Sequence, residues 1–184
     1  MITQSMKPKY HSLRGFTIIE VLIAVLVLSL GLLGMAGLQA TSLRANTSAA
    51  QRGQATLLAY DIIDRMRANR DQALAGSYVN TAGTTPTTGG TDCQSAATCD
   101  AAEMAAYDLN QWKCLLGNWS SNAVCANMGI TRGLLPDGDG DIDMNGDQVT
   151  VTITWSETHW GDSDNDGTGE RESSDISLAV GTQL

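Results

Sequence analysis

Aromatic residues are scarce in this chain of 184 residues, which has one Phe and 5% aromatic side chains overall. All four Trp residues lie between positions 112 and 160, and large aromatic side chains dominate the packing of protein cores. The packed part of the protein is therefore expected in the second half of the chain. The length allows one modest domain together with an appendage.

Basic residues are also scarce after Asp71, where sixteen acidic residues face only three basic ones and the net charge is −13. Nucleic-acid affinity comes largely from Lys and Arg side chains that displace counterions. Direct binding of DNA or RNA by this acidic segment is therefore disfavoured. The first 15 residues show the opposite bias, because they contain no acid and three bases, Lys7, Lys9 and Arg14.

No two cysteines are close in sequence, and the only histidine in the same part of the chain is His159. A structural zinc site usually contains a close Cys pair, so the spacing argues against a metal centre. Disulfides are the better interpretation, and they indicate an oxidising compartment. Of the three possible connectivities we favour the one whose two bridges each close a short loop, Cys93 with Cys99 and Cys114 with Cys125.

One long apolar segment is present, at residues 13–40, and it contains a single carboxylate, Glu20. The 18 residues from Val21 to Leu38 carry no charge and form about 27 Å of helix, which is enough to span a bilayer. No small-x-small cleavage site follows this segment, so we expect it to be retained. The basic residues before it place the amino end in the cytoplasm and the acidic head across the membrane. A simple anchor leaves Glu20 unexplained, since a lone charge in hydrocarbon is costly.

The sequence Gly-Phe-Thr-Ile-Ile-Glu from Gly15 to Glu20, followed by an apolar helix, resembles the class III signal of type IV prepilins and of type II secretion pseudopilins. The resemblance implies that a membrane prepilin peptidase cuts between Gly15 and Phe16 and methylates Phe16. Residues 1–15 are then a leader peptide, although translation could also begin at Met6. Glu20 is expected to meet the new amino terminus of a neighbouring subunit, which fixes the registry between subunits.

The helix should continue beyond the membrane as one element from Phe16 to near Ala75. Residues 16–40 would form its membrane and filament-core part, and residues 41–75 an amphipathic continuation. Its predicted buried stripe contains Ala55, Leu57, Leu58, Ala59, Ile62, Ile63 and Met66. Asp61 and Arg65 are spaced for an ion pair, which we expect on the solvent side.

The globular head is expected at residues 76–184. A Gly- and Thr-rich connection leads to a short helix at 101–116 with Ala105, Leu109, Trp112 and Leu116 inward. Apolar residues alternate with Thr and Ser from Val149 to Ser156, which predicts a half-buried strand with Val149, Val151, Ile153 and Trp155 inward. Its expected antiparallel partner contains Ile176, Leu178 and Val180. A small antiparallel sheet packed on the long helix gives an α+β, type IV pilin-like fold. The segments "YDLNQW", "LLPDGDG" and "VTVTITW" resemble the PilV type of minor pilin.

Two acidic segments resemble the start of EF-hand calcium loops, Asp162, Asp164 and Asp166 in one and Asp141, Asp143 and Asn145 in the other. Neither has Glu at position twelve. We therefore expect solvated turns and no cofactor, with calcium as the alternative.

Three classes of function remain open. A minor pilin would help to prime, assemble or modify a type IV pilus, together with other minor pilins, the major pilin and the inner-membrane assembly platform. It would be anchored in the inner membrane of a Gram-negative cell with a periplasmic head, and would then lie at the tip of the extracellular pilus. A minor pseudopilin of type II secretion is the first alternative, and an adhesive or calcium-binding head is the second. An enzyme is not expected, because His159 has no recognisable nucleophile motif.

Overall fold

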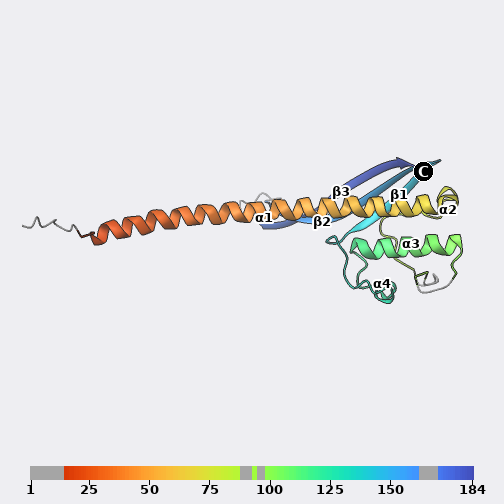
Figure 1. Cartoon of the computed structure of the whole chain (residues 1–184), viewed down its shortest axis with the longest axis horizontal. Helices are drawn as coiled ribbons and strands as arrows, with labels where there is room; N and C mark the ends of the chain where they lie inside the picture. Colours follow the sequence, from red (N-terminus) through yellow and green to blue (C-terminus); the bar gives the residue numbers. More distant parts are fainter. Residues whose placement is uncertain (1–14, 88–92, 95–97, 162–169) are drawn as a thin grey trace, which may run out of the picture. The chain divides into compact units, whose positions relative to one another are not determined.

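The computed structural model describes residues 15–87, 93–94, 98–161 and 170–184 (Figure 1). The chain divides into two compact units, Met1–Ala45 and Asn46–Leu184, and each is described by itself. The second unit begins well before residue 76. Much of the amphipathic segment that the sequence analysis separated from the head is therefore part of the same compact unit as the sheet.

Helix α1 (Ile18–Ala68) contributes to both units and is followed by the short helix α2 (Arg70–Leu74). The prediction of one helix to near Ala75 is therefore wrong at Asn69, which leaves the helical conformation with φ −118° and ψ 49°. Its side-chain amide donates to the carbonyl of Ala101, 2.6 Å away, and to Tyr78 Oη. The Asn69 side chain therefore links the end of α1 to the start of helix α3, which begins at Ala101.

The sheet has three antiparallel strands in the order β1 (Asp139–Asn145), β2 (Gln148–Gly161) and β3 (Glu170–Gln183) (Figure 1). The predicted strands are confirmed as β2 and β3. Strand β1 corrects the interpretation of Asp141 to Gly146 as an acidic loop, because Asp141 and Asp143 pair with β2 opposite Thr152 and Thr150. A segment held in a sheet ladder cannot wrap around an ion as an EF-hand loop does.

The core lies between α1, the sheet and helix α3 (Ala101–Leu116). The inward residues predicted for β2 are all buried, and the indole N–H of Trp112 donates to the carbonyl of Leu58, 3.0 Å away. Of the predicted α1 stripe, six members are buried. Leu57 is the exception, with 72% of its surface exposed, because it lies on the helix face that points away from the core.

Both favoured disulfides are present. Cys93 pairs with Cys99, and Cys114 pairs with Cys125. Cys114 and Cys125 are fully buried, and their bridge links α3 to the short helix α4 (Ala123–Asn127). The two bridges therefore stabilise segments that contribute little to the central sheet.

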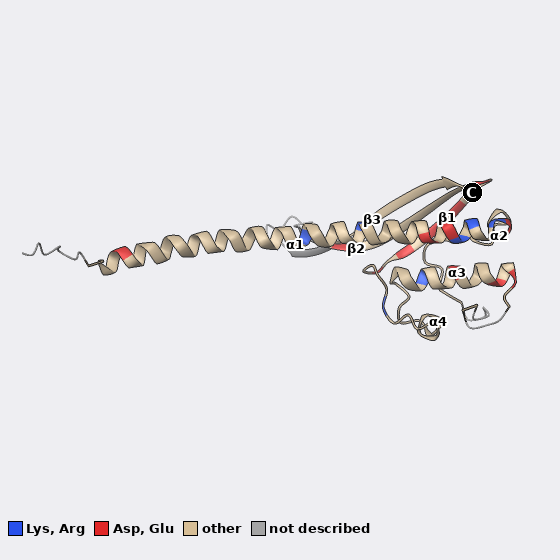
Figure 2. Ribbon diagram, viewed as in Figure 1, with Lys and Arg blue, Asp and Glu red and all other residues tan. Residues whose placement is uncertain are grey.

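The ion pair between Arg65 and Asp61 is confirmed, at 2.9 Å, but it is only partly on the solvent side, because the Arg65 side chain is 25% exposed and the Asp61 side chain 43% exposed. The Arg65 guanidinium also donates to Asp108 of α3, 3.0 Å away, and to Gln111. Asp108 is buried and accepts a second hydrogen bond from Tyr78 Oη at 2.7 Å. Burial and this bond to Asp108 both raise the pKa of Tyr78. Arg65 therefore joins α1 to α3, and Figure 2 shows basic residues in blue and acidic residues in red on both helices.

Candidate functional site

The candidate site is the start of α1, in the first unit. Gly15, Phe16 and Thr17 precede the helix and are exposed, with 84% of the Phe16 surface accessible. A Cβ atom added at Gly15 would meet no atom of the chain within 4 Å. The protein's own fold therefore does not require glycine at this position. If glycine is needed here, the need must come from another protein, such as a peptidase that reads this segment.

Thr17 precedes the first turn of α1 and accepts the first helical hydrogen bonds. Its carbonyl accepts from the N–H groups of Glu20 and Val21 at 3.1 and 3.3 Å. Its hydroxyl Oγ1 also lies 3.4 Å from the N–H of Glu20. Glu20 is thus the third residue of the helix, where a carboxylate is stabilised by the positive end of the helix dipole.

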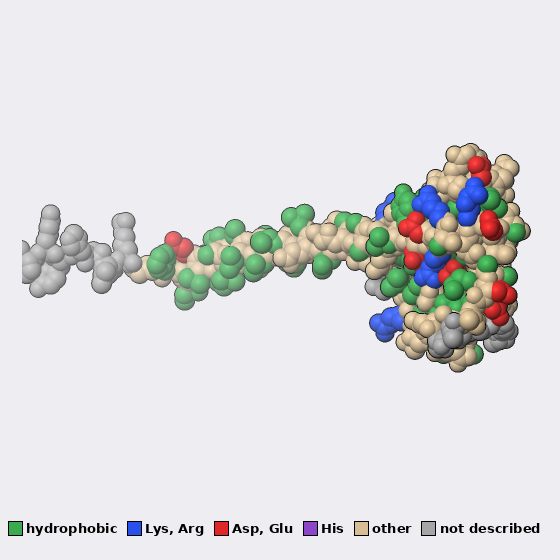
Figure 3. Space-filling model, turned by 45° about the vertical axis from the view of Figure 1, so that its right-hand side comes forward, with side chains coloured by type: hydrophobic (Ala, Val, Ile, Leu, Met, Phe, Trp, Pro, Cys, Tyr) green, Lys and Arg blue, Asp and Glu red, His purple; other side chains and the backbone are tan. Residues whose placement is uncertain are grey.

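The Glu20 carboxylate has no hydrogen bond and no ion pair within the described residues, and the residue is exposed. The side chains around it on α1 are apolar and equally exposed, as the large hydrophobic residues from Ile18 to Leu43 show. Figure 3 shows these hydrophobic side chains along the first unit. In hydrocarbon a carboxylate in such surroundings would need compensation from a group outside the described part of the chain.

Helix α1 is long and apolar enough to cross a membrane, by length and composition. Three glycines, Gly31, Gly34 and Gly37, lie in its apolar part, and a Cβ added at any of them would meet nothing within 4 Å. Small residues on a membrane helix let another helix backbone approach closely. The surface of this segment is therefore suited to contacts with other helices or with lipid.

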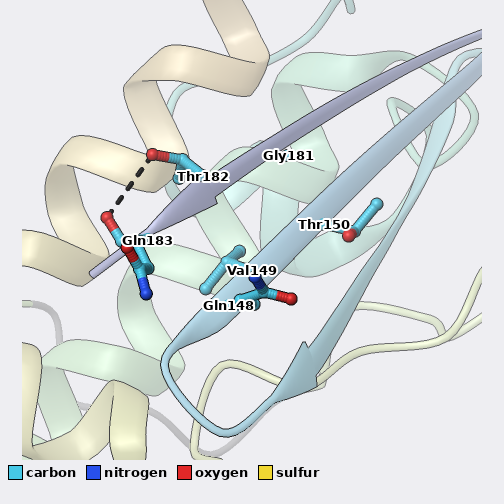
Figure 4. A pocket seen from close by; sticks show the side chains of 6 residues that line it. All are labelled: Gln148, Val149, Thr150, Gly181, Thr182 and Gln183. Carbon is cyan, nitrogen blue, oxygen red and sulfur yellow. Dashed lines mark hydrogen bonds between the residues drawn. The ribbon is translucent and has the colours of Figure 1, made fainter.

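The described part of the head offers little acid–base or metal chemistry. Within those residues no group of three or more His, Cys, Asp or Glu side chains could hold a metal ion. The acidic segment with Asp162, Asp164 and Asp166 lies outside the described residues. A shallow pocket at the end of the β2 and β3 ladder is lined by Gln148, Val149, Thr150, Gly181, Thr182 and Gln183 (Figure 4). These residues supply hydrogen-bonding groups but no acid or base.

A long amino-terminal helix followed by a small antiparallel sheet is the α+β architecture of pilin subunits. Two family models match the chain and adjoin one another. The one described as "Prokaryotic N-terminal methylation motif" matches residues 12–36, and the one described as "Type IV pilin Tt1218" matches residues 37–110. No curated protein and no solved structure matches the chain. The chain is a type IV pilin with an N-terminal methylation motif.

The leader motif implies processing by a prepilin peptidase and assembly into a pilus with other pilins. The apolar helix and the motif together fit a membrane-anchored pilin. The type IV pilin family is structural rather than enzymatic. The methylation motif match includes Gly15, Phe16 and Glu20, so these three residues are the candidate assembly site of the subunit.

Sequence reasoning missed two features of the head that position its elements. One is strand β1, which the pair Asn145 and Gly146 at its end could have indicated, since Asn-Gly between two apolar alternations is a hairpin signal. The other is a buried ion pair between Lys113 and Asp139. No local pattern marks that pair, because the two residues lie 26 positions apart in the chain.

Proposed function

We propose that this type IV pilin is a minor pilin of the PilV type, which helps to prime, assemble or modify the filament and lies at its tip. The single observation that carries its assembly with other subunits is the carboxylate of Glu20, which is exposed on an apolar helix and has no partner among the described residues. Such a group is compensated when a positive group of another subunit meets it in the apolar bundle.

In this proposal a prepilin peptidase cuts after Gly15, and the new amino group at Phe16 of one subunit meets Glu20 of a neighbour. The subunit waits in the inner membrane of a Gram-negative cell with its head in the periplasm, and then enters the extracellular pilus. Its partners are other minor pilins, the major pilin and the inner-membrane assembly platform. The minor role is supported by the head motifs, of which "YDLNQW" lies in α3 and "VTVTITW" in β2.

The test is immunogold labelling of sheared surface filaments, combined with deletion of the gene and complementation by the wild-type chain. We expect label at filament ends, and loss of pilus number and twitching on deletion. Label along whole filaments would indicate a major subunit instead. Copurification with a secretion apparatus and normal pili after deletion would favour the pseudopilin alternative.

The second alternative, a calcium-binding or adhesive head, has a separate test. We expect millimolar calcium to leave the thermal unfolding of the full chain unchanged, since Asp, Asn and Gly also favour solvated turns. A rise in the unfolding temperature that Asp164→Ala abolishes would establish the calcium site instead, because a ligand bound only to the folded state stabilises it. Binding of labelled pili to host cells, lost on deletion while pilus number is unchanged, would support adhesion.

A further inference from the structure

The two outer edges of the three-stranded sheet differ in whether another segment of the head covers them. Strand β1 lies at one edge and β3 at the other. At the first edge Asn80 pairs with Ile142 in both directions, with N···O distances of 3.1 and 2.7 Å. At the second edge no described backbone group outside β2 pairs with β3 between Asp175 and Gln183. An edge that is left open in this way can accept a strand from another chain.

The pairing of the strands also shows which backbone groups of β3 reach this open edge. Successive residues of an antiparallel strand direct their N–H and C=O groups to alternate sides. Ile142 bonds outward to Asn80, so its pair with Val151 of β2 is not hydrogen-bonded. Val151 therefore bonds to its partner on the other side, Val180 of β3. The groups that reach the open edge belong to the alternate residues of β3: Asp175, Ser177, Ala179, Gly181 and Gln183.

The open edge lacks the features by which proteins usually protect an edge strand. Such strands are kept short, or they carry Lys, Pro or a β-bulge. From Asp175 to Gln183 there is no Lys, Arg or Pro, and every residue pairs with one residue of β2 without a bulge. The middle residues of the edge, Ser177, Ala179 and Gly181, are small and exposed. An extended strand can therefore approach the β3 backbone without displacing a large side chain.

Strand β3 also leaves apolar surface uncovered on the side of the sheet that faces the core. Its apolar residues on that side, Ile176, Leu178 and Val180, are only partly buried, whereas the β2 residues that pair with them are fully buried. The difference arises because β2 has a strand on both sides and β3 on only one. A further strand would cover part of this surface, so the edge offers apolar contacts as well as hydrogen bonds.

We propose that the open edge of β3 binds an extended strand from the head of a different pilin in the same filament. This inference rests on the proposed function, because it requires assembly with other subunits. The partner strand directs apolar residues toward Ile176, Leu178 and Val180 and small or polar residues to the other face. The only charged edge residue is Asp175, and the chain after Asp71 has a net charge of −13. The partner strand is therefore neutral or basic, since opposite charges stabilise a strand pair and like charges destabilise it.

A second copy of this chain is a poor occupant of the edge for two reasons. Antiparallel pairing of β3 with another β3 would turn the second copy end for end, so the part of α1 that runs along the sheet would point the opposite way (Figure 1). Subunits anchored in one membrane have α1 in the same direction. Parallel pairing keeps that direction, but it places two strongly acidic heads side by side, and their net charges repel. The partner is therefore a different and less acidic pilin.

The experiment compares the full-length variants Ala179→Pro and Ala179→Lys with Thr150→Lys as the matched control. Ala179→Pro removes one N–H of the open edge, and Pro is tolerated in a strand where that N–H faces solvent. Ala179→Lys adds the side chain that protects many natural edges. Thr150 is exposed and pairs with Gly181, so it lies on the same face of the sheet as Ala179 but in the central strand.

Three quantities are measured. The first is the unfolding temperature of each full-length variant in detergent, which shows whether the head still folds. The second is the share of the protein in sheared filaments. The third is the identity of the neighbour, found by placing a photo-crosslinking amino acid at Ser177, or at Thr150 as its control, and identifying the crosslinked peptides by mass spectrometry.

We expect both Ala179 variants to fold and to fall at least about fivefold in filament share, which corresponds to the net loss of one hydrogen bond. Thr150→Lys should match the wild type. The crosslink from Ser177 should reach a strand in the head of another pilin, and the one from Thr150 should not.

An unchanged filament share in Ala179→Lys, or an equal loss in Thr150→Lys, would overturn the proposal. A crosslink from Ser177 to a second copy, to a protein other than a pilin, or to nothing would also overturn it. If Ala179→Pro fails to fold, Ala179→Lys decides the result. If Ala179→Lys assembles normally while Glu20→Ala does not, only this inference fails. If neither variant lowers the filament share, the proposed function itself is wrong.

Discussion

Lys113 of α3 donates a hydrogen bond from its ammonium to Asp139 of β1, at 2.5 Å, and their side chains are only 2% and 11% exposed. The ammonium also donates to the carbonyl of Gly140, 2.8 Å away. Asp139 accepts further bonds from the backbone N–H groups of Gly83 and Gly140. This buried pair therefore fixes three segments to one another: α3, β1 and the connection that precedes α3.

Removing one member of this pair should destabilise the head strongly. Lys113→Met keeps most of the side-chain volume but leaves the Asp139 carboxylate buried without its cation, which costs about 3 to 5 kcal/mol in comparable cases. The matched control is Arg132→Met, because Arg132 is exposed. Urea unfolding of the full chain in detergent measures both. A loss for Lys113→Met no larger than that for Arg132→Met would show that the pair does not hold the head together.

The same pair predicts a specific dependence of stability on pH. Burial alone would raise the pKa of Asp139, but hydrogen bonds from Lys113, Gly83 and Gly140 and the Lys113 charge lower it overall. The unfolded value is about 3.9, so the contribution is present above that pH and is lost as pH falls through the lower folded-state pKa. Below about pH 4, the free energy of unfolding should fall more steeply in the wild type than in Asp139→Asn. Parallel curves for the two proteins would contradict this assignment.

The two disulfides should contribute unequally. Cys114 and Cys125 are fully buried and lie 11 positions apart, whereas Cys93 and Cys99 lie 6 apart. A longer closed loop restrains the unfolded chain more, and a bridge of this size typically contributes about 2 to 4 kcal/mol. The double variant Cys114→Ala with Cys125→Ala should therefore unfold at a lower temperature than Cys93→Ala with Cys99→Ala. Equal unfolding temperatures would show that the Cys114–Cys125 bridge does not stabilise the head more than the Cys93–Cys99 bridge.

The sequence pattern was sufficient for the elements whose apolar residues recur at a regular spacing. Val149, Val151 and Ile153 alternate along β2 and are all buried, and α3 has the predicted bounds. In strand β1 the alternation is limited to Ile142 and Met144, and the acidic residues next to them favour turns. Strand β1 forms because β2 lies beside it and pairs with it, so tertiary context overrides the local preference of these residues for a turn.

Polar contacts between residues far apart in the chain could not be predicted from the sequence either. The i,i+4 spacing of Asp61 and Arg65 identified their ion pair but gave no sign of Asp108, which lies 43 positions from Arg65 and decides that the pair is partly covered. For the assembly site the situation is reversed. Gly15, Phe16 and Glu20 belong to one short motif of six residues, so the sequence alone was sufficient to propose them. What it could not indicate was that the Glu20 carboxylate is left without a partner in its own helix.

Processing should depend on Gly15 for a reason outside the fold of the subunit. A Cβ at this position meets nothing in the chain, so Gly15→Ala should leave the head folded and the protein inserted in the membrane. We expect the peptidase to reject it, and the uncleaved precursor to accumulate there. Amino-terminal mass spectrometry distinguishes the precursor from a mature chain that starts at methylated Phe16. An uncleaved chain found in sheared filaments would contradict the requirement for cleavage.

The central claim is that Glu20 acts in assembly and not in insertion or processing. Glu20→Ala makes the apolar segment more apolar, so insertion and cleavage after Gly15 should be unaffected. In a filament the partner amino group would lose its carboxylate, which for buried pairs costs about 3 to 5 kcal/mol. Glu20→Gln separates charge from shape, because it keeps the size and hydrogen bonding of the side chain.

The measurement that tests this claim most directly is the share of mature protein in sheared filaments, compared for wild type, Glu20→Ala and Glu20→Gln. The account predicts that both variants are cleaved and methylated at Phe16 but accumulate in the inner membrane, with few or no copies in filaments. If both appear in sheared filaments at wild-type levels and pilus number is unchanged, Glu20 does not fix the registry between subunits.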